Sequence, residues 1–327
     1  MSANLCALAV GTETDGSVLA PASINGIVGI KPTVGLVSRT GIVPIMATQD
    51  TAGPLGRTVE DAAALLTVLG AVDPSDKAAQ AKARPKPMNY AEGLIFDALK
   101  GARLGVVRST LGENLRTRKL FDAALATLKA AGAMLVEGLE LPKVDEEESL
   151  LYELKAGLAD YLKTRRPESP HRTLADIIAF NEKNAEREMP WFGQDLFLKA
   201  EKKGPLIEPA YKAARAKDLG NAKIKGIDAV MAKDRLDALV TLTVDAGPVI
   251  DLLNGDNLAG SYGCQHAAIA GYPGITVPVG DDYGLPIGLY IYGRAWSEAQ
   301  LIRYAYAFEQ ATNHRKVPQL LPTTKFG

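Results

Sequence analysis

Apolar residues recur at helical spacing in several parts of the chain. Between residues 57 and 70, Thr58 can cap the first turn, apolar side chains fall on one face, and Gly70 ends the pattern. The charged stretch 144–235 repeats leucine on or near one face, and the stretch 297–312 is amphipathic. The leucines of the charged stretch are Leu150, Leu151, Leu154, Leu158 and Leu162. We therefore expect helices in all three places.

Short apolar runs bounded by turn residues predict strands between the helices. These runs are 102–108, 133–141, 237–243, 274–280 and 286–293. A helical pattern at 118–132 separates the first two runs, and this strand–helix–strand order implies a parallel pair with a crossover. Near the N-terminus, residues 2–10 are typical of a small-residue helix that runs into a buried strand. The pattern predicts an α/β fold with a mixed sheet in one continuous domain, residues 1–327.

The composition argues against several classes of function. The chain has 327 residues, 47% of them apolar, which is enough for a large core without disulfides or metals. Its 37 basic and 38 acidic residues give a net charge of −1, which argues against nucleic acid as a partner because phosphate binding needs a basic excess. No apolar run approaches the ~20 residues of a membrane span. The two cysteines, Cys6 and Cys264, form no disulfide framework and favour a reducing, cytoplasmic compartment.

The beginning of the sequence lacks the features of a leader. Residues 1–17 have no basic region and no small-residue cleavage site, so they do not form a secretory signal. They also lack the loose polar residues with which most domains begin. We expect that an upstream part of the protein precedes Met1 and that any export signal would lie on it.

The sequence favours neither a metal nor a nucleotide. The histidines His171, His266 and His314 are scattered, and Cys264 is separated from His266 by one residue, which does not suit zinc. The stretch 11–16, GTETDG, partly resembles a calcium loop, but it lacks the first ligand and the closing glutamate. No glycine-rich phosphate motif is present, so no cofactor is expected.

A serine in a tight turn is the remaining chemical feature. Ser17 follows Gly16, and a glycine here allows close backbone approach and a positive φ. Such a turn can direct several backbone N–H groups into one pocket, as a nucleophilic serine requires. On spacing alone, a Gly-Ser pair is more often a structural turn than a nucleophile. His266 could supply a base for Ser17, or it could be hydrogen-bonded locally.

Several motifs in register change this interpretation. They are GTETDGS at 11–17, GIKPT at 29–33, DTAGP at 50–54 and AIAGYPGITVPVG at 268–280. Together they resemble the amidase signature family, and TETDGS looks most like bacterial peptide amidases, which hydrolyse C-terminal peptide amides. The resemblance implies a mixed twisted β-sheet flanked by helices, and a serine amidase without a cofactor.

The resemblance also implies a Ser–Ser–Lys mechanism and matches residues to it. Ser17 matches the nucleophile that forms the acyl-enzyme. The backbone N–H groups of Thr14, Asp15, Gly16 and Ser17 match the loop that stabilises the oxyanion. Lys31 lies in the GIKPT motif and is not the lysine that the family uses as its base.

The chain departs from the family in what precedes Ser17. The family's bridging serine and catalytic lysine lie farther upstream than the sixteen residues before Ser17 here. A serine hydroxyl without a base is nearly inert near neutral pH. We therefore expect an amidase whose activity as this chain is impaired, and the alternative is an inactive remnant that binds a ligand or a partner subunit.

The expected partners follow from the same interpretation. They are a small or peptide amide substrate and a second copy of the chain in a homodimer, with no nucleic acid and no membrane span. Asp15 would lie near the pocket and disfavour anionic substrates. The helical region 144–235 would shape the pocket for the acyl group.

Overall fold

The computed structural model describes residues 1–165, 168–255, 257 and 260–319. Within these residues, one sheet of eight strands runs in the order β1–β3–β2–β7–β8–β6–β4–β5. The strands are β1 (Ala9–Glu13), β2 (Val28–Lys31), β3 (Thr51–Gly56), β4 (Arg103–Val106), β5 (Met134–Val136), β6 (Ala238–Leu242), β7 (Gly274–Asp282) and β8 (Leu285–Tyr292). Parallel pairing joins β4 to β5 and to β6, and the other neighbouring pairs are antiparallel. The predicted parallel pair with a crossover is therefore confirmed, and α3 (Leu115–Ala130) is the connecting helix.

Two predicted elements near strand ends are wrong. Residues 2–8 form turns rather than a helix, and β1 begins at Ala9. Leu5 and Cys6 are exposed there, so a helix would have little apolar surface to bury. The predicted strand 133–141 is reduced to the three residues of β5, and Gly138 then takes a φ of 75°, which a strand does not continue.

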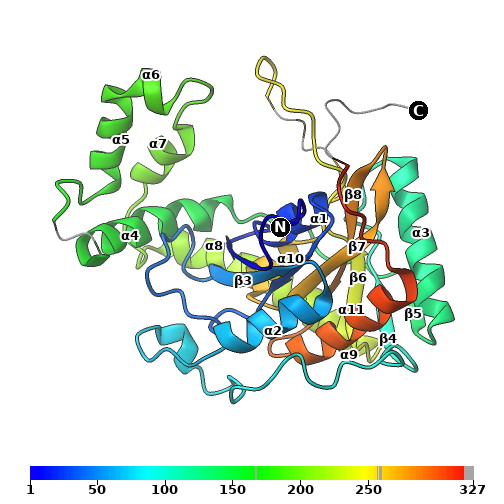
Figure 1. The fold of residues 1–327 in the computed structure, drawn as a ribbon. Helices are drawn as coiled ribbons and strands as arrows, with labels where there is room; N and C mark the ends of the chain where they lie inside the picture. Colours follow the sequence, from blue (N-terminus) through cyan, green and yellow to red (C-terminus); the bar gives the residue numbers. More distant parts are fainter. Residues whose placement is uncertain (166–167, 256, 258–259, 320–327) are drawn as a thin grey trace.

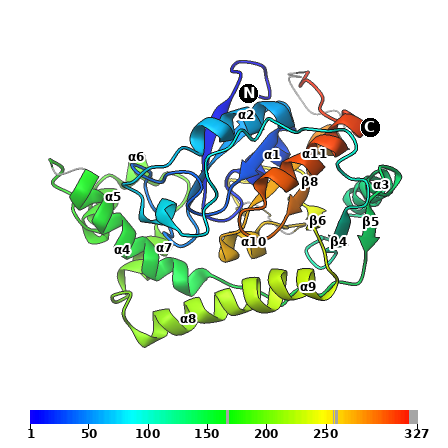
Figure 2. The same cartoon turned by 90° about the horizontal axis from the view of Figure 1, so that it is seen from below.

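Helices cover both faces of the sheet (Figures 1 and 2). Side chains of β8 alternate between two cores, one on each face of the sheet. Ile287, Leu289 and Ile291 belong to the first core, and Tyr290 and Tyr292 belong to the second. The first core is completed by α2 (Val59–Leu69), α3 and α11 (Glu298–Thr312), and the second by α1 (Leu19–Ile24), α9 (Asp228–Lys233) and α10 (Gln265–Ala270). The long polar connection after α2 contains one 3₁₀ turn, η1 (Lys77–Gln80). The predicted mixed sheet flanked by helices is thus present.

Helix α2 begins where the sequence predicts. The Thr58 hydroxyl accepts a hydrogen bond from the Asp61 N–H at 3.1 Å, and Gly70 ends the helix. A second acceptor comes from α11, where Glu309 Oε1 accepts the Val59 N–H at 2.8 Å. The start of α2 is therefore held by its own cap and by a carboxyl group of the neighbouring helix.

The Glu309 carboxyl makes the stability of the protein depend on pH. Burial, opposed by hydrogen bonds from Val59 and Gln310, raises the pKa of Glu309 from 4.5 to about 7. Between these two pH values the folded state binds more protons than the unfolded state, so the free energy of unfolding falls as pH rises. The shift corresponds to about 3 kcal/mol, and solvent screening of this partly exposed side chain reduces the expected loss to about 2 kcal/mol.

Glu309→Gln is expected to remove this loss, because the amide oxygen still accepts the Val59 N–H but carries no titrating proton. Urea unfolding of the wild type and the variant at pH 4.5 and at pH 7.5 measures the effect. The exposed carboxyl variant Glu140→Gln serves as the control and should keep the wild-type pH dependence. Parallel pH profiles for the wild type and Glu309→Gln would contradict the prediction.

The region 144–235 consists mainly of helices in the structure, and part of it has a core of its own. Its helices are α4 (Glu147–Arg165), α5 (Leu174–Lys183), α6 (Ala185–Glu188), α7 (Asp195–Glu201), α8 (Pro209–Leu219), η2 (Gly220–Ile227) and α9. Figure 1 shows α5, α6 and α7 beside the sheet rather than on its faces, and Figure 2 shows α8 running through η2 into α9. The separate core contains Leu151, Leu154, Leu158, Leu162, Leu174, Ile178 and Ala200. Among the described helices, none is long and apolar enough to cross a bilayer.

Candidate active site

The predicted site residues lie together in the turn between β1 and α1. Glu13 ends β1, and Ser17 is exposed just before α1. Gly16 has a φ of 79°, and a Cβ atom there would stand 2.5 Å from the hydroxyl of Tyr262. Both observations require glycine at this position. We call residues 14–18 the serine turn.

The buried carboxylate of Glu13 supports the serine turn from its own strand. Its Oε2 accepts hydrogen bonds from the backbone N–H groups of Val18 at 2.9 Å and Leu19 at 3.0 Å. Burial raises the pKa of Glu13, while the positive charge of Lys31 and the N–H groups of Val18, Leu19 and Gly16 oppose the shift. This carboxylate therefore ties the end of β1 to the first residues of α1.

Lys31 is a buried cation whose charge acts on this carboxylate. Its Nζ donates hydrogen bonds to the carbonyl oxygens of Tyr272 at 2.6 Å and Pro32 at 3.2 Å. Burial lowers the pKa of Lys31, and the negative charges of Glu13 and Glu298 oppose that shift. Lys31 is thus bound by backbone carbonyls, which favours a structural role.

Two further carboxyl groups lie close together at the serine turn. Asp15 faces Glu146, which precedes α4, and the Tyr262 hydroxyl shares its one proton between the Asp15 carbonyl oxygen at 3.0 Å and Asp15 Oδ1 at 3.1 Å. Burial, the Glu146 charge and the Glu13 charge raise the pKa of Asp15, and burial likewise raises the pKa of Glu146. The pair therefore resists carrying two negative charges, and this disfavours a further anion beside the turn.

The loop before β3 contacts the serine turn through two residues. The Thr14 hydroxyl donates to Asp50 Oδ1 at 2.6 Å, and Asp50 Oδ2 accepts the N–H groups of Ile45 and Met46 at 2.9 and 3.0 Å. Gln49 Nε2 donates to the Thr14 carbonyl at 3.3 Å and to Glu146 Oε2 at 2.7 Å. These bonds connect the serine turn to the segment that leads into α4.

Most backbone donors of the serine turn have no acceptor. In the described part of the chain, no hydrogen bond is donated by the N–H groups of Thr14, Asp15, Gly16 and Ser17, and the Ser17 hydroxyl has no partner either. Unpaired N–H groups beside an exposed serine are the arrangement that an oxyanion loop needs. The assignment of Ser17 as nucleophile, and of Thr14, Asp15 and Gly16 to the oxyanion loop, stays a prediction.

His266 is bonded away from Ser17. Its Nε2 lies 2.8 Å from the Pro142 carbonyl oxygen, and burial lowers the pKa of this histidine. The Sγ of Cys264 is likewise close to a carbonyl, that of Thr243 at 3.8 Å. The contacts favour local bonding for His266 over a Ser–His pair. Nowhere in the described ranges do three or more His, Cys, Asp or Glu side chains gather as a metal site would require.

Sequence reasoning missed five side chains that contact the serine turn. They are Glu13, Gln49, Asp50, Glu146 and Tyr262. A signal existed for the first three, since they lie inside or next to the GTETDGS and DTAGP motifs. The last two lie in unremarkable sequence, and only the fold brings them to the turn.

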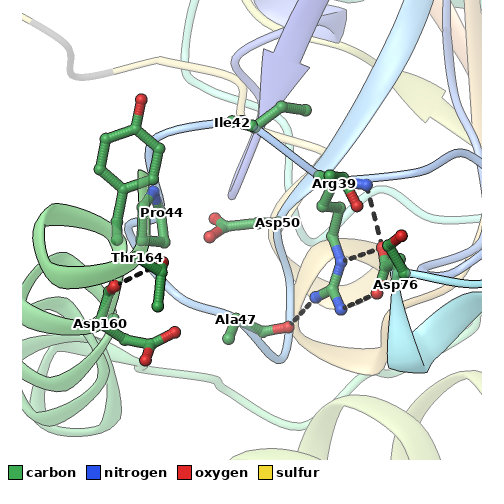
Figure 3. A pocket seen from close by; sticks show the side chains of 13 residues that line it. Arg39, Ile42, Pro44, Ala47, Asp50, Asp76, Asp160 and Thr164 are labelled. Atoms are coloured by element: carbon green, nitrogen blue, oxygen red, sulfur yellow. Dashed lines mark hydrogen bonds and ion pairs between the residues drawn. The ribbon is translucent and has the colours of Figure 1, made fainter. Parts of the chain in front are cut away.

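A cleft of about 250 Å³ lies between the loop 39–50 and α4 (Figure 3). Arg39 is bound on one side by Asp76, with N–O distances of 2.8 and 3.0 Å, and it also donates to the Ala47 carbonyl. Figure 3 shows Asp50 in the middle of the cleft, and the α4 residues that line the opposite wall are Gly157, Asp160, Tyr161 and Thr164. Ser17 does not line the cleft, which meets the serine turn through Asp50.

Comparison with known proteins decides the family. A sequence model of the family described as Amidase matches residues 1–302. The chain belongs to the amidase signature family. A probable amidase of Arabidopsis thaliana is 40% identical over 334 residues, covering 98% of this chain and 60% of that protein. A glutamyl-tRNA(Gln) amidotransferase subunit from a Synechococcus strain is 34% identical over 362 residues, covering 100% of this chain and 65% of that protein.

A solved member of the family has the same fold. The native peptide amidase from Stenotrophomonas maltophilia superimposes with a TM-score of 0.88 at 45% identity, covering 97% of this chain and 65% of the other. This likeness confirms the predicted fold class and the suspected family. The chain spans about two thirds or less of the length of these relatives.

Proposed function

We propose that the protein is a hydrolase that cleaves the C–N bond of a carboxamide through an acyl-enzyme on Ser17. The observation that carries the proposal is the serine turn. Ser17 is exposed beside backbone N–H groups without acceptors, and it follows a glycine whose positive φ would be strained in a larger residue. Membership of the amidase signature family supports the same reaction.

The proposed reaction follows the chemistry of a serine nucleophile. Ser17 Oγ forms a bond to the amide carbon while its proton passes to a base, and the N–H groups of Asp15 and Ser17 stabilise the oxyanion. The oxyanion then collapses, the C–N bond breaks, and the nitrogen takes up the proton and leaves. Water attacks the resulting ester in the second step and releases the acid.

The base of this reaction is the second serine and lysine that the family resemblance implies. Within the described residues, no side chain accepts a hydrogen bond from the Ser17 hydroxyl, and Lys31 is engaged elsewhere. We therefore infer that turnover by residues 1–327 is impaired. Donors of an oxyanion loop can still leave an acceleration of roughly 10³–10⁴ over water.

We propose C-terminal peptide amides as the substrate class. The 45% identity with a peptide amidase, against 34% with the amidotransferase protein, supports this choice. The raised pKa values of Asp15 and Glu146 beside the serine turn disfavour an anionic group at the scissile amide. A C-terminal amide is neutral where a free C-terminus is charged, so it fits this surrounding. The cleft wall supplied by α4 supports the proposal that region 144–235 shapes the substrate pocket.

A panel of amides tests the substrate class. Ammonia release is measured for a dipeptide with a C-terminal amide, and for a dipeptide of similar size whose amide is an asparagine side chain beside a free carboxylate. We expect faster release from the C-terminal amide by at least about tenfold, which corresponds to about 1.4 kcal/mol of discrimination. Equal rates for both substrates would contradict the proposed class.

The alternative is a remnant that binds amides or a partner subunit without catalysis. The unpartnered Ser17 hydroxyl, among the residues that the structure describes, is the observation that favours it. Saturable binding of the dipeptide amide without ammonia release above the solution rate would support this alternative and reject the first. For the cellular setting we propose a homodimer in a reducing, cytoplasmic compartment, where Cys6 and Cys264 stay free thiols.

A further inference from the structure

Two side chains from distant parts of the chain bind carbonyl groups of the serine turn. Gln49 Nε2 donates to the Thr14 carbonyl at 3.3 Å, and the Tyr262 hydroxyl donates to the Asp15 carbonyl at 3.0 Å. A third carbonyl, that of Gly16, accepts the N–H of the first turn of α1 at 2.7 Å. Three consecutive peptide groups are therefore held at their oxygen atoms.

Holding a carbonyl fixes the N–H of the next residue. The two groups share one planar peptide unit, and in a trans peptide they point in opposite directions. Among the described residues there is no cis peptide bond. The bond from Gln49 to Thr14 therefore directs the Asp15 N–H to the other side, away from Gln49. The bond at the Gly16 carbonyl does the same for the Ser17 N–H.

The peptide between Asp15 and Gly16 is held at its oxygen atom by Tyr262. Rotation of this peptide group would break that hydrogen bond. It lies between the peptide groups that carry the N–H groups of Asp15 and Ser17, and neither N–H has an acceptor in the described part of the chain.

The two side chains that hold the turn differ in their surroundings. Gln49 is fully buried, donates to Glu146 as well, and has its own N–H bound to the Met46 carbonyl at 2.8 Å. Tyr262 is partly exposed, and its backbone N–H is bound to the Thr110 carbonyl at 2.9 Å. Desolvation of its hydroxyl raises the pKa of Tyr262, so the hydroxyl keeps its proton and stays a donor.

We propose that Gln49 and Tyr262 are positioning residues for the oxyanion loop. Gln49 aims the Asp15 N–H at the reacting carbonyl, and Tyr262 fixes the peptide group between the Asp15 and Ser17 donors. The role in catalysis rests on the proposed function of Ser17, whereas the anchoring of the turn can be measured without activity.

Tyr262→Phe tests the proposal, because it removes the hydroxyl and keeps the ring. The matched control is Tyr152→Phe. The Tyr152 hydroxyl that this variant loses donates to Glu208 at 2.7 Å in the helical region. The first readout is amide hydrogen exchange at Gly16 in the full chain. The second is kcat and KM for the dipeptide amide. We expect exchange at Gly16 to be at least about tenfold faster and kcat about tenfold lower with KM within about twofold, since misaligned donors weaken transition-state binding.

Each outcome decides one of the two proposals. Unchanged exchange at Gly16 in Tyr262→Phe, or equal changes in Tyr152→Phe, would overturn the positioning role. Faster exchange at Gly16 in Tyr262→Phe would support the anchoring. If amide hydrolysis is equally fast in the wild type and in Ser17→Ala, the proposed function is rejected. Gln49→Met provides a second variant, in which we expect the drop in kcat without faster exchange at Gly16, because the Tyr262 bond remains.

Discussion

Replacing Ser17 with alanine is expected to abolish covalent acylation of the chain. An activated ester such as p-nitrophenyl acetate makes a weak nucleophile sufficient, because p-nitrophenolate is a good leaving group. Ser17 Oγ then forms the ester bond, p-nitrophenolate departs, and the hydroxyl proton passes to solvent. Intact mass after incubation should show one acetyl group on the wild type and none on Ser17→Ala. Hydrolysis of the dipeptide amide by this variant should not exceed the rate left by the oxyanion donors alone.

The control for this experiment is Ser109→Ala. Ser109 is exposed like Ser17 but lies in the loop after β4. This variant should be acetylated at the wild-type rate, and peptide mapping should place the acetyl group on residue 17. An adduct that persists in Ser17→Ala, or that maps to other serines in the wild type, would count against the proposed nucleophile.

Lys31→Met is expected to cost about 3–5 kcal/mol of stability, the largest effect on folding that we predict. Lys31 is fully buried, and the substitution removes the positive charge that acts on the buried Glu13 and Glu298 carboxyl groups. The carbonyls of Pro32 and Tyr272 also lose their donor. Urea unfolding at constant pH measures the loss.

Two further variants serve as controls for the stability measurement. Lys82→Met removes an exposed lysine and should change stability by no more than about 0.5 kcal/mol. The double variant Glu13→Gln with Lys31→Met removes one of the unpaired carboxylates, so its loss should be smaller than the sum of the single losses. If the Lys31→Met protein is as stable as the Lys82→Met protein, the buried Lys31 side chain contributes nothing to the free energy of unfolding.

Local patterns in the sequence were sufficient for much of the fold. The cap at Thr58, the leucine face of α4 and the parallel pair of β4 and β5 all depend on residues close together in the chain, or on a rule of connection. The helix predicted at 2–8 failed because small apolar residues have the right composition for a helix but find no surface to bury against. Propensity alone does not reveal that.

The candidate site divides in the same way. Ser17 and Gly16 could be singled out because the chemistry of the turn is local, and a positive φ at Gly16 is a property of a few neighbouring residues. Local sequence patterns could not identify the residues that hold the turn. Glu146 and Tyr262 are more than a hundred positions away, and they reach the turn through the approach of α4 and through the carboxyl end of β6. Contacts of that kind exist only in the folded chain.

The separate core of α4, α5 and α7 has a consequence for how this region can change. None of its buried side chains belongs to either core of the sheet, so this packing is not part of the cores that hold the sheet. Such a unit opens at a lower free energy than the whole protein and behaves as a cooperative unit of its own. Substitutions in it that change the α4 wall of the cleft can therefore arise while the two cores of the sheet keep their packing.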